Sequence, residues 1–151
     1  MGITIDRATS EHLDAVTPLF DAYRRFFTHK DDTAVSESFI GARLAVGDSV
    51  IFLAFEDGEA VGFIQLYPLF SSWYARRIWF LSDLYVAEEA RKRSIGRALV
   101  RRVVEYAEET EASSVMVELP FSEPHLQRFY SSFGFAKDDI FELYRLKVAT
   151  A

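Results

Sequence analysis

The stretch LSDLYVAEEARKRSIGRALV, residues 81–100, decides how the rest of the sequence is interpreted. Its first half is apolar and β-prone, and beyond Gly96 a helical pattern places Val100, Val103 and Val104 on one face. A strand that leads through such a turn into a helix directs backbone N–H groups and the positive end of the helix at an anion. The stretch therefore predicts a binding site for a phosphorylated ligand.

Basic residues concentrate in this turn and the following helix, although the chain carries a formal net charge of -6. They are Arg91, Lys92, Arg93, Arg97, Arg101 and Arg102. Such a cluster is often only a solvated face or a set of partners for nearby glutamates, so charge alone does not establish phosphate binding. The acidic remainder of the chain argues against non-specific nucleic-acid binding, which depends on neutralising phosphates. We expect no nucleic-acid partner.

The composition indicates one globular domain spanning residues 1–151, with 50% hydrophobic and 26% charged residues. The chain has no cysteine, which excludes disulfides and a thiol nucleophile. The three histidines lack the spacing of metal ligands, so no metal is expected. No apolar run reaches the roughly 18–20 residues of a membrane span, and the N-terminus does not look like a signal peptide. These features predict a cytoplasmic protein without a membrane partner.

Hydrophobic periodicity predicts ten elements in the order β-α-α-β-β-β-α-β-α-β. The Asp57-Gly58 pair lies between two β-prone runs and predicts a hairpin. Pro68 is expected to end the second run and open an aromatic loop. The expected strands cover residues 3–7, 49–55, 60–67, 77–86, 114–119 and 140–148, and the expected helices 13–27, 35–46, 94–109 and 124–133. This order predicts an α/β (α+β) fold, a mixed sheet with helices on both faces.

The sequence resembles the GCN5-related N-acetyltransferases (GNAT) over nearly its whole length. The resemblance rests on the element order, the Asp57-Gly58 hairpin, DLYVAEEARKRSIGRAL at 83–99 and FYSSFGF at 129–135. It is strongest to small members similar to histone/polyamine acetyltransferases. It implies a mixed, mostly antiparallel central sheet flanked by helices, with acetyl-CoA (coenzyme A) as cosubstrate.

The family signature [Q/R]-x-x-G-x-[G/A] fits the turn with Arg91 in the first position and Gly96 in place of the second glycine. Ser94 then replaces the first glycine, which is a departure, because glycine lets the backbone approach a pyrophosphate closely. A shifted register starting at Arg93 also fits, but the spacing from Val86 favours Arg91. The resemblance implies two groups of cofactor-binding residues: Leu84, Tyr85 and Val86 beside the pantetheine arm, and Arg91, Lys92, Arg93, Ser94, Ile95, Gly96 and Arg97 around the pyrophosphate.

The resemblance also implies direct acetyl transfer, in which the Leu84 N–H stabilises the oxyanion and Tyr130 protonates the leaving thiolate. A tyrosine taken alone is more often a core aromatic residue than an acid, and the motif around Tyr130 favours the catalytic role. Asp83 is the preferred general base, and Glu118 is an alternative, as are a water relay and an amine that arrives neutral. The alternative for Asp83 is a structural role, in which it orients a loop or pairs with Arg76 or Arg77. Glu123 replaces an asparagine that the family often carries near the cofactor, and its role is not carried over.

The leading function is acetyl transfer to a primary amine of a small molecule or peptide, and the chain's negative charge favours a cationic acceptor. The alternative is a non-catalytic acyl-CoA sensor or interaction module of the same fold, which the departures at Ser94 and Glu123 favour. Aromatic residues of the expected loop would form a substrate lid, cap the core or contact a second copy in a homodimer. They are Phe70, Trp73 and Tyr74.

Overall fold

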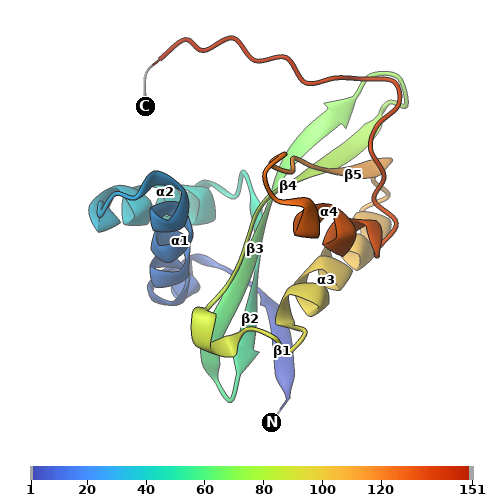
Figure 1. Cartoon of the computed structure of the whole chain (residues 1–151). Helices are drawn as coiled ribbons and strands as arrows, with labels where there is room; N and C mark the ends of the chain where they lie inside the picture. Colours follow the sequence, from blue (N-terminus) through green and yellow to red (C-terminus); the bar gives the residue numbers. More distant parts are fainter. Residues whose placement is uncertain (1, 150–151) are drawn as a thin grey trace. The chain divides into compact units, whose positions relative to one another are not determined.

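The computed structural model describes residues 2–149, which divide after Glu118 into a large and a small compact unit. Figure 1 shows the chain coloured along its sequence. The large unit contains β1 (Ile3–Arg7), α1 (Leu13–Thr28), α2 (Thr33–Val46), β2 (Val50–Glu56), β3 (Glu59–Ser71), β4 (Arg76–Val86), α3 (Ile95–Glu109) and β5 (Ser114–Val117), and the small unit contains α4 (Pro124–Ser131). Short 3-10 helices precede α1 (Ser10–His12) and follow β4 (Glu88–Ala90).

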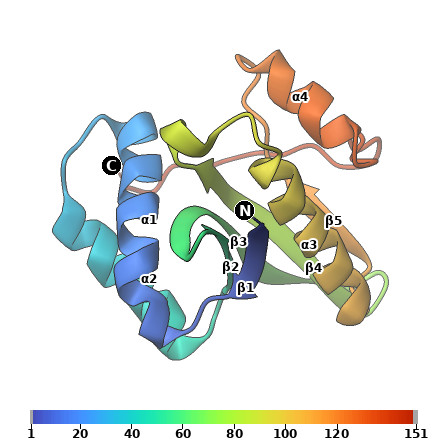
Figure 2. The same ribbon diagram turned by 90° about the horizontal axis from the view of Figure 1, so that it is seen from below.

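The strands form a mixed sheet in the order β1-β2-β3-β4-β5. Successive pairs from β1 to β4 are antiparallel, and β5 runs parallel to β4. Two views show α1 and α2 on one face of this sheet and α3 on the other (Figures 1 and 2). The mixed, mostly antiparallel sheet with helices on both faces, expected from the sequence, is therefore confirmed.

Each helical layer buries an apolar stripe against the sheet. On one face, Val16 and Phe20 of α1 and Ile40 of α2 join a buried cluster with Leu53 of β2 and Phe63 of β3. On the other face, α3 buries Ile95, Leu99, Val100, Val103 and Ala107. Removal of these side chains from water is the main driving force for the three-layer arrangement.

A polar cluster joins α1 to α2. The buried Asp21 carboxylate of α1 accepts hydrogen bonds from the hydroxyls of Ser36 (2.7 Å) and Thr33 (3.0 Å) on α2. It also pairs with Arg25 one turn along α1. The Ser36 hydrogen bond, helped by Thr33 and Arg25, keeps the pKa of Asp21 below its ordinary value despite burial. These hydrogen bonds therefore hold α2 against α1.

The prediction of a loop from Pro68 was wrong, because β3 continues to Ser71, and residues 72–75 form the turn before β4. The pairing of β2 with β3 ends at Val50 and Leu66, so Pro68 lies where β3 pairs only with β4. Proline is tolerated on such an edge because its missing N–H then removes no ladder hydrogen bond. Phe70, Trp73 and Tyr74 are exposed, which excludes the interpretation that they cap the core.

The predicted strand over residues 140–148 was also wrong, because the structure assigns no strand there. The segment alternates as a strand does, but alternation stabilises a strand only when one face is buried and a neighbouring strand pairs with it. In the small unit the apolar side chains of this segment remain exposed: Ile140, Phe141, Leu143, Tyr144, Leu146 and Val148.

Close packing of α3 against β3 depends on Gly62. A Cβ at this position would lie 3.0 Å from the Tyr85 carbonyl oxygen and 3.4 Å from Cδ1 of Leu99. We predict that Gly62→Val lowers the free energy of unfolding by about 1–3 kcal/mol, as overpacking does, measured by urea denaturation.

Gly41→Ala is the matched control, because a Cβ there meets nothing closer than Leu13 at 3.5 Å. Alanine in this helical position should raise the free energy of unfolding by about 0.5–1 kcal/mol. Equal urea midpoints for Gly62→Val and the wild type would contradict the close approach of α3.

Candidate functional site

The pairing of β3 with β4 contains a β-bulge. Gln65 lies opposite Asp83 and Leu66 lies opposite Leu81, so Ser82 has no residue opposite it. Bulges bend a strand and change the direction of its side chains, and they occur often next to active sites. Here the bulge coincides with Asp83, the carboxylate that the sequence indicated as a candidate base.

Asp83 is buried and its carboxylate accepts hydrogen bonds at both oxygens. The Gln65 amide donates to Oδ2 (2.6 Å), and the Ser82 hydroxyl donates to Oδ1 (3.1 Å). Burial raises the pKa of Asp83 above its ordinary value, while the hydrogen bonds from Gln65, Tyr23 and Ser82 oppose this rise. A carboxylate with a raised pKa is a better proton acceptor than an exposed one, which suits a general base.

The alternative pairing of Asp83 with a neighbouring arginine is not found. The Arg76 guanidinium donates to the backbone oxygen of Glu111. The Arg77 guanidinium lies over the rings of Phe70 and Trp79. The hydrogen bonds of Asp83 instead come from uncharged groups, so no positive charge from these arginines stabilises its ionised form.

Two tyrosines lie beside the bulge. The Tyr23 hydroxyl of α1 donates to the Ser82 carbonyl oxygen (3.3 Å). Burial and the nearby charge of Asp83 raise the pKa of Tyr67 to about 12. The Tyr67 phenol therefore stays protonated at neutral pH and is available as a hydrogen-bond donor.

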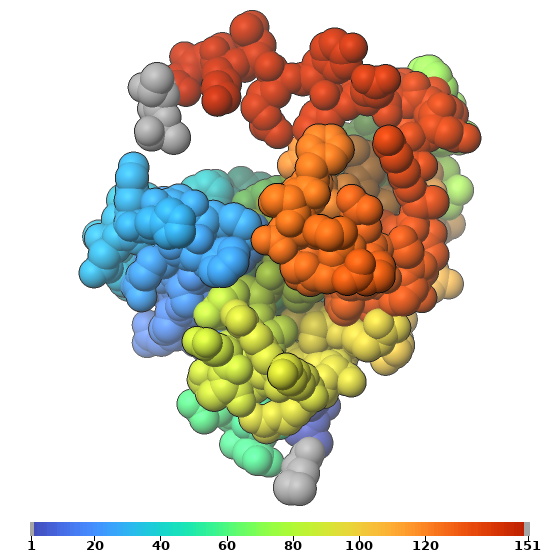
Figure 3. Space-filling view, viewed as in Figure 1, coloured from blue at the N-terminus to red at the C-terminus, as the bar shows by residue number. Residues whose placement is uncertain are grey.

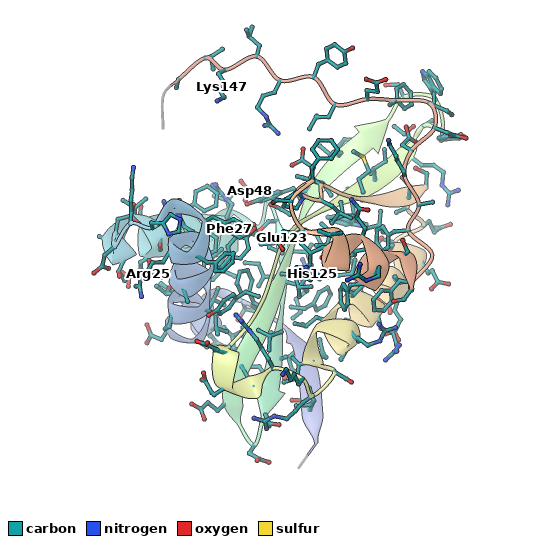
Figure 4. The ribbon with its side chains drawn as sticks, in the orientation of Figure 1. Arg25, Phe27, Asp48, Glu123, His125 and Lys147 are labelled. Atoms are coloured by element: carbon teal, nitrogen blue, oxygen red, sulfur yellow. The ribbon has the colours of Figure 1, made fainter. Side chains whose placement is uncertain are left out.

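An aromatic surface extends from Tyr23 along α1. The Tyr23 and Phe27 ring centroids are 5.1 Å apart, and Phe26 continues the contact at 5.1 Å from Phe27. Figure 4 shows Phe27 on the sheet-facing side of α1. Both phenylalanine side chains are more than half exposed, so this surface offers apolar area to a ligand close to the bulge.

One edge of β4 lacks a strand partner beyond the bulge. Among the described residues, β5 pairs with β4 over Ile78–Leu81 and not further. Leu84, Tyr85 and Val86 pair with β3 on their other side. An open strand edge presents N–H and C=O groups to which an extended ligand binds as an added strand. The three residues indicated for the pantetheine arm lie on this edge.

The basic turn that follows has an unusual backbone. Lys92 and Ser94 both adopt left-handed conformations, with φ of 67° and 64°. Helix α3 begins directly afterwards at Ile95, and the first N–H groups of a helix have no partner within it. Backbone N–H groups of a turn, together with the first N–H groups of a helix, can form a concave site that binds anions. Figure 3 shows the turn and its preceding 3-10 helix, in yellow to yellow-green, at the surface of the large unit.

The arginines of the turn brace it. The Arg93 guanidinium donates to both carboxylate oxygens of Glu56 (2.6 and 2.7 Å) and to the Glu89 carbonyl oxygen (2.7 Å). The Arg91 side chain donates to the Val86 carbonyl oxygen (2.9 Å). The sequence assigned both residues to cofactor binding, and the structure adds that both hold the turn in shape. The turn's N–H groups and basic residues, next to an open strand edge, fit a phosphorylated ligand with an extended arm.

Tyr130 belongs to the small unit, where it lies in α4. Its side chain is buried, and its ring lies 5.0 Å from the Phe129 centroid and 5.4 Å from the Phe135 centroid. Burial raises the pKa of its phenol well above the ordinary value. A phenol of this kind is protonated at neutral pH, as a proton donor must be.

The other acidic candidates lie elsewhere. Glu118 is exposed at the end of the large unit. Glu123 is the N-cap residue of α4, and its carboxylate lies 3.3 Å from Nδ1 of His125. Neither is buried as Asp83 is.

Sequence reasoning missed the polar residues around Asp83. They are Ser49, Gln65, Tyr23 and Tyr67. One signal was present: Gln65 is a single amide within an otherwise apolar strand, and a buried amide needs partners.

Two further features are absent from the described residues. Residues 2–149 contain no group of three or more His, Cys, Asp or Glu side chains placed to hold a metal ion. Within the same residues, no helix combines the length and the apolar character needed to span a bilayer.

Comparison with known proteins gives consistent matches. The model of the acetyltransferase (GNAT) family matches residues 16–135. An uncharacterized N-acetyltransferase of Bacillus subtilis, YhfO, is 35% identical over 146 residues, covering 97% of this chain and 98% of its own. The crystal structure of a probable acetyltransferase is 39% identical, with a TM-score of 0.94 over 98% of this chain and 99% of that one.

A more distant structure shares the fold. It is the aminoglycoside N-acetyltransferase AAC(6')-Iy in complex with CoA, which is 18% identical to this chain. Its TM-score is 0.77, over 97% of this chain and 95% of that one.

The left-handed conformation of Ser94 generates a prediction about stability. A residue with a Cβ pays about 1–2 kcal/mol for this conformation, and glycine does not, although glycine loses more backbone freedom on folding. We predict that Ser94→Gly raises the free energy of unfolding by up to about 1 kcal/mol, measured by urea denaturation.

Ser94→Ala is the control, because it removes the hydroxyl and keeps the Cβ. It should bring no gain in stability. If Ser94→Ala stabilised the protein as much as Ser94→Gly, backbone strain at this position would not be the cause.

Proposed function

The chain belongs to the acetyltransferase (GNAT) family and is an acetyl-CoA-dependent N-acetyltransferase, and from this premise we propose its acceptor class and the residues that act. We propose direct transfer of the acetyl group to a primary amine of a small cationic molecule or basic peptide, by residues 1–151 working as one catalytic domain. The observation that carries the proposal is a buried carboxylate, Asp83, at a bulge beside an open strand edge that leads into the anion-binding turn.

The proposed cofactor contacts follow this edge and turn. Leu84 and Val86 pair through their backbone with the pantetheine arm, and Tyr85 lies between them on the same strand. The pyrophosphate is held by backbone N–H groups of the turn, from Arg91 to Arg97. Because Arg91 and Arg93 already brace the backbone, the N–H groups are in place before the ligand arrives.

In the proposed chemistry, acetyl-CoA supplies an activated acetyl group as a thioester. Asp83 accepts a proton from the acceptor's ammonium group and releases it to solvent after the transfer. The freed amine nitrogen forms the new C–N bond and loses its second proton to solvent as the amide forms. The Leu84 N–H stabilises the negative charge that develops on the carbonyl oxygen. Tyr130 donates its proton to the sulfur as the C–S bond breaks, and it is reprotonated from solvent.

The class of acceptor is proposed from the negative charge of the chain and from the exposed aromatic side chains of α1. Asp83 attracts an ammonium group, and the net charge of -6 favours the approach of cations. The exposed rings of Phe26 and Phe27 provide a surface for the rest of the acceptor, through apolar or cation–π contact. A polyamine or a basic peptide, as in the histone/polyamine group, has this chemistry. We also propose a cytoplasmic location, and a homodimer in which exposed aromatics such as Trp73 lie at the contact.

A second candidate function is a non-catalytic acyl-CoA sensor or interaction module. Two observations favour it: both oxygens of Asp83 already accept hydrogen bonds, and Glu123 replaces an asparagine. Tight CoA binding by calorimetry, with no release of free thiol across a broad panel of amines, would support this candidate over catalysis.

We predict that the purified protein releases free thiol from acetyl-CoA when mixed with amines, and that Tyr130→Phe lowers kcat by about 100-fold. The affinity for CoA, measured by calorimetry, should not change, because phenylalanine keeps the ring and its packing and lacks only the hydroxyl group.

Tyr144→Phe provides the control, because Tyr144 is exposed in the same unit, and it should turn over like the wild type. Mass spectrometry of the product should show one added acetyl group on the amine. A wild-type rate for Tyr130→Phe would show that another group protonates the thiolate.

A further inference from the structure

Three polar side chains form a buried chain that runs from the residue before β2 through β3 to β4. The Ser49 hydroxyl donates to Oε1 of Gln65 (2.8 Å), and Nε2 of Gln65 donates to Oδ2 of Asp83 (2.6 Å). Gln65 is 0% exposed, so no solvent molecule competes for these bonds. An amide at the centre of an apolar sheet is costly unless both its ends are hydrogen-bonded, as they are here.

The order of donors and acceptors gives this chain a direction. An ionised carboxylate only accepts, so Gln65 must present its NH₂ group to Asp83. The carbonyl end of the amide then needs a donor, and the Ser49 hydroxyl is one. If the amide rotated by half a turn, two acceptor oxygens would face each other at Asp83, and the Ser49 hydroxyl would have to become an acceptor.

We propose that Gln65 is a positioning residue for the acetyl transfer, which orients Asp83 and stabilises its carboxylate form, and that Ser49 fixes the orientation of the Gln65 amide. The inference rests on the proposed role of Asp83 as the general base. Gln65 touches no reacting atom in this scheme, and it acts through the carboxylate.

Other groups also face Asp83, and they stay in place when Gln65 is changed. The Tyr23 hydroxyl comes from α1 and the Ser82 hydroxyl from β4 itself. Tyr67 of β3 interacts electrostatically with Asp83, and Arg43 and Asp48 act in turn on Tyr67. A Gln65 substitution therefore removes one hydrogen-bond donor from Asp83 and leaves the other groups around the carboxylate in place.

The test compares the pH dependence of kcat/KM for the wild type and Gln65→Leu, together with an NMR titration of the Asp83 carboxyl. A base must be ionised to act, so activity falls as the pH decreases through the pKa of Asp83. Loss of the donor raises this pKa further, so the acidic limb and the NMR titration should both move to higher pH by about 1–2 units.

Two further variants keep the test decisive if Gln65→Leu does not fold. Gln65→Glu preserves the shape but places a second carboxylate beside Asp83, and it should shift the acidic limb in the same direction, because two like charges cannot both ionise easily. Ser49→Ala releases the amide and should give a smaller shift, also to higher pH.

Ser36→Ala is the matched control. It removes a serine hydrogen bond of 2.7 Å from another buried carboxylate, that of Asp21. It should lower the free energy of unfolding and leave the acidic limb where it is in the wild type.

The readouts separate this inference from the proposed function. If the wild type releases no thiol with any amine, the proposed function fails, and the NMR titration still decides whether Gln65 controls the ionisation of Asp83. If folded Gln65 variants keep the wild-type acidic limb and the wild-type Asp83 titration, Gln65 only ties the strands together and the inference is overturned.

Discussion

The burial of the Asp83 carboxylate within the sheet is the constraint on which the site depends. A buried carboxylate without hydrogen bonds would be too costly to keep, so its surroundings must supply donors. The bulge at Ser82 brings one donor, and the neighbouring strand supplies Gln65. All the hydrogen-bond donors are uncharged, which leaves the pKa raised, whereas an arginine at the same place would lower it. The sheet thus stabilises the carboxylate enough to persist and leaves it basic.

The same strand connects this carboxylate to the basic turn before α3. Beyond Leu81, β4 separates from β5 and leaves one edge open, and the strand then enters the turn that starts α3. A ligand that pairs with this edge is held in register by the backbone, so its phosphate end and its reactive end are placed by one rigid element. Because the backbone would hold the ligand, the side chains along this edge need only be apolar.

Local patterns predicted most of the large unit, because its elements are specified by residues close together in the sequence. The Asp57-Gly58 hairpin and the strand–turn–helix of residues 81–100 are examples. The hydrogen bonds of Asp83 were not predictable in this way, since Ser49, Gln65 and Asp83 lie on or beside three different strands and meet only through sheet pairing. The errors at Pro68 and at residues 140–148 have the same origin, because edges and unpaired segments are decided by which strands lie beside them.

Ser94 shows how a departure from a family signature can be accommodated. Ser94 adopts the left-handed conformation that normally favours glycine. Its Cβ makes this conformation less favourable, which lowers the free energy of unfolding. Arg93, which bridges Glu56 and the Glu89 carbonyl, holds the turn from the outside. Such bracing compensates for local strain, because the interactions around the residue fix its conformation. The shape of the turn is therefore a property of all its residues, and serine in place of a glycine does not abolish it.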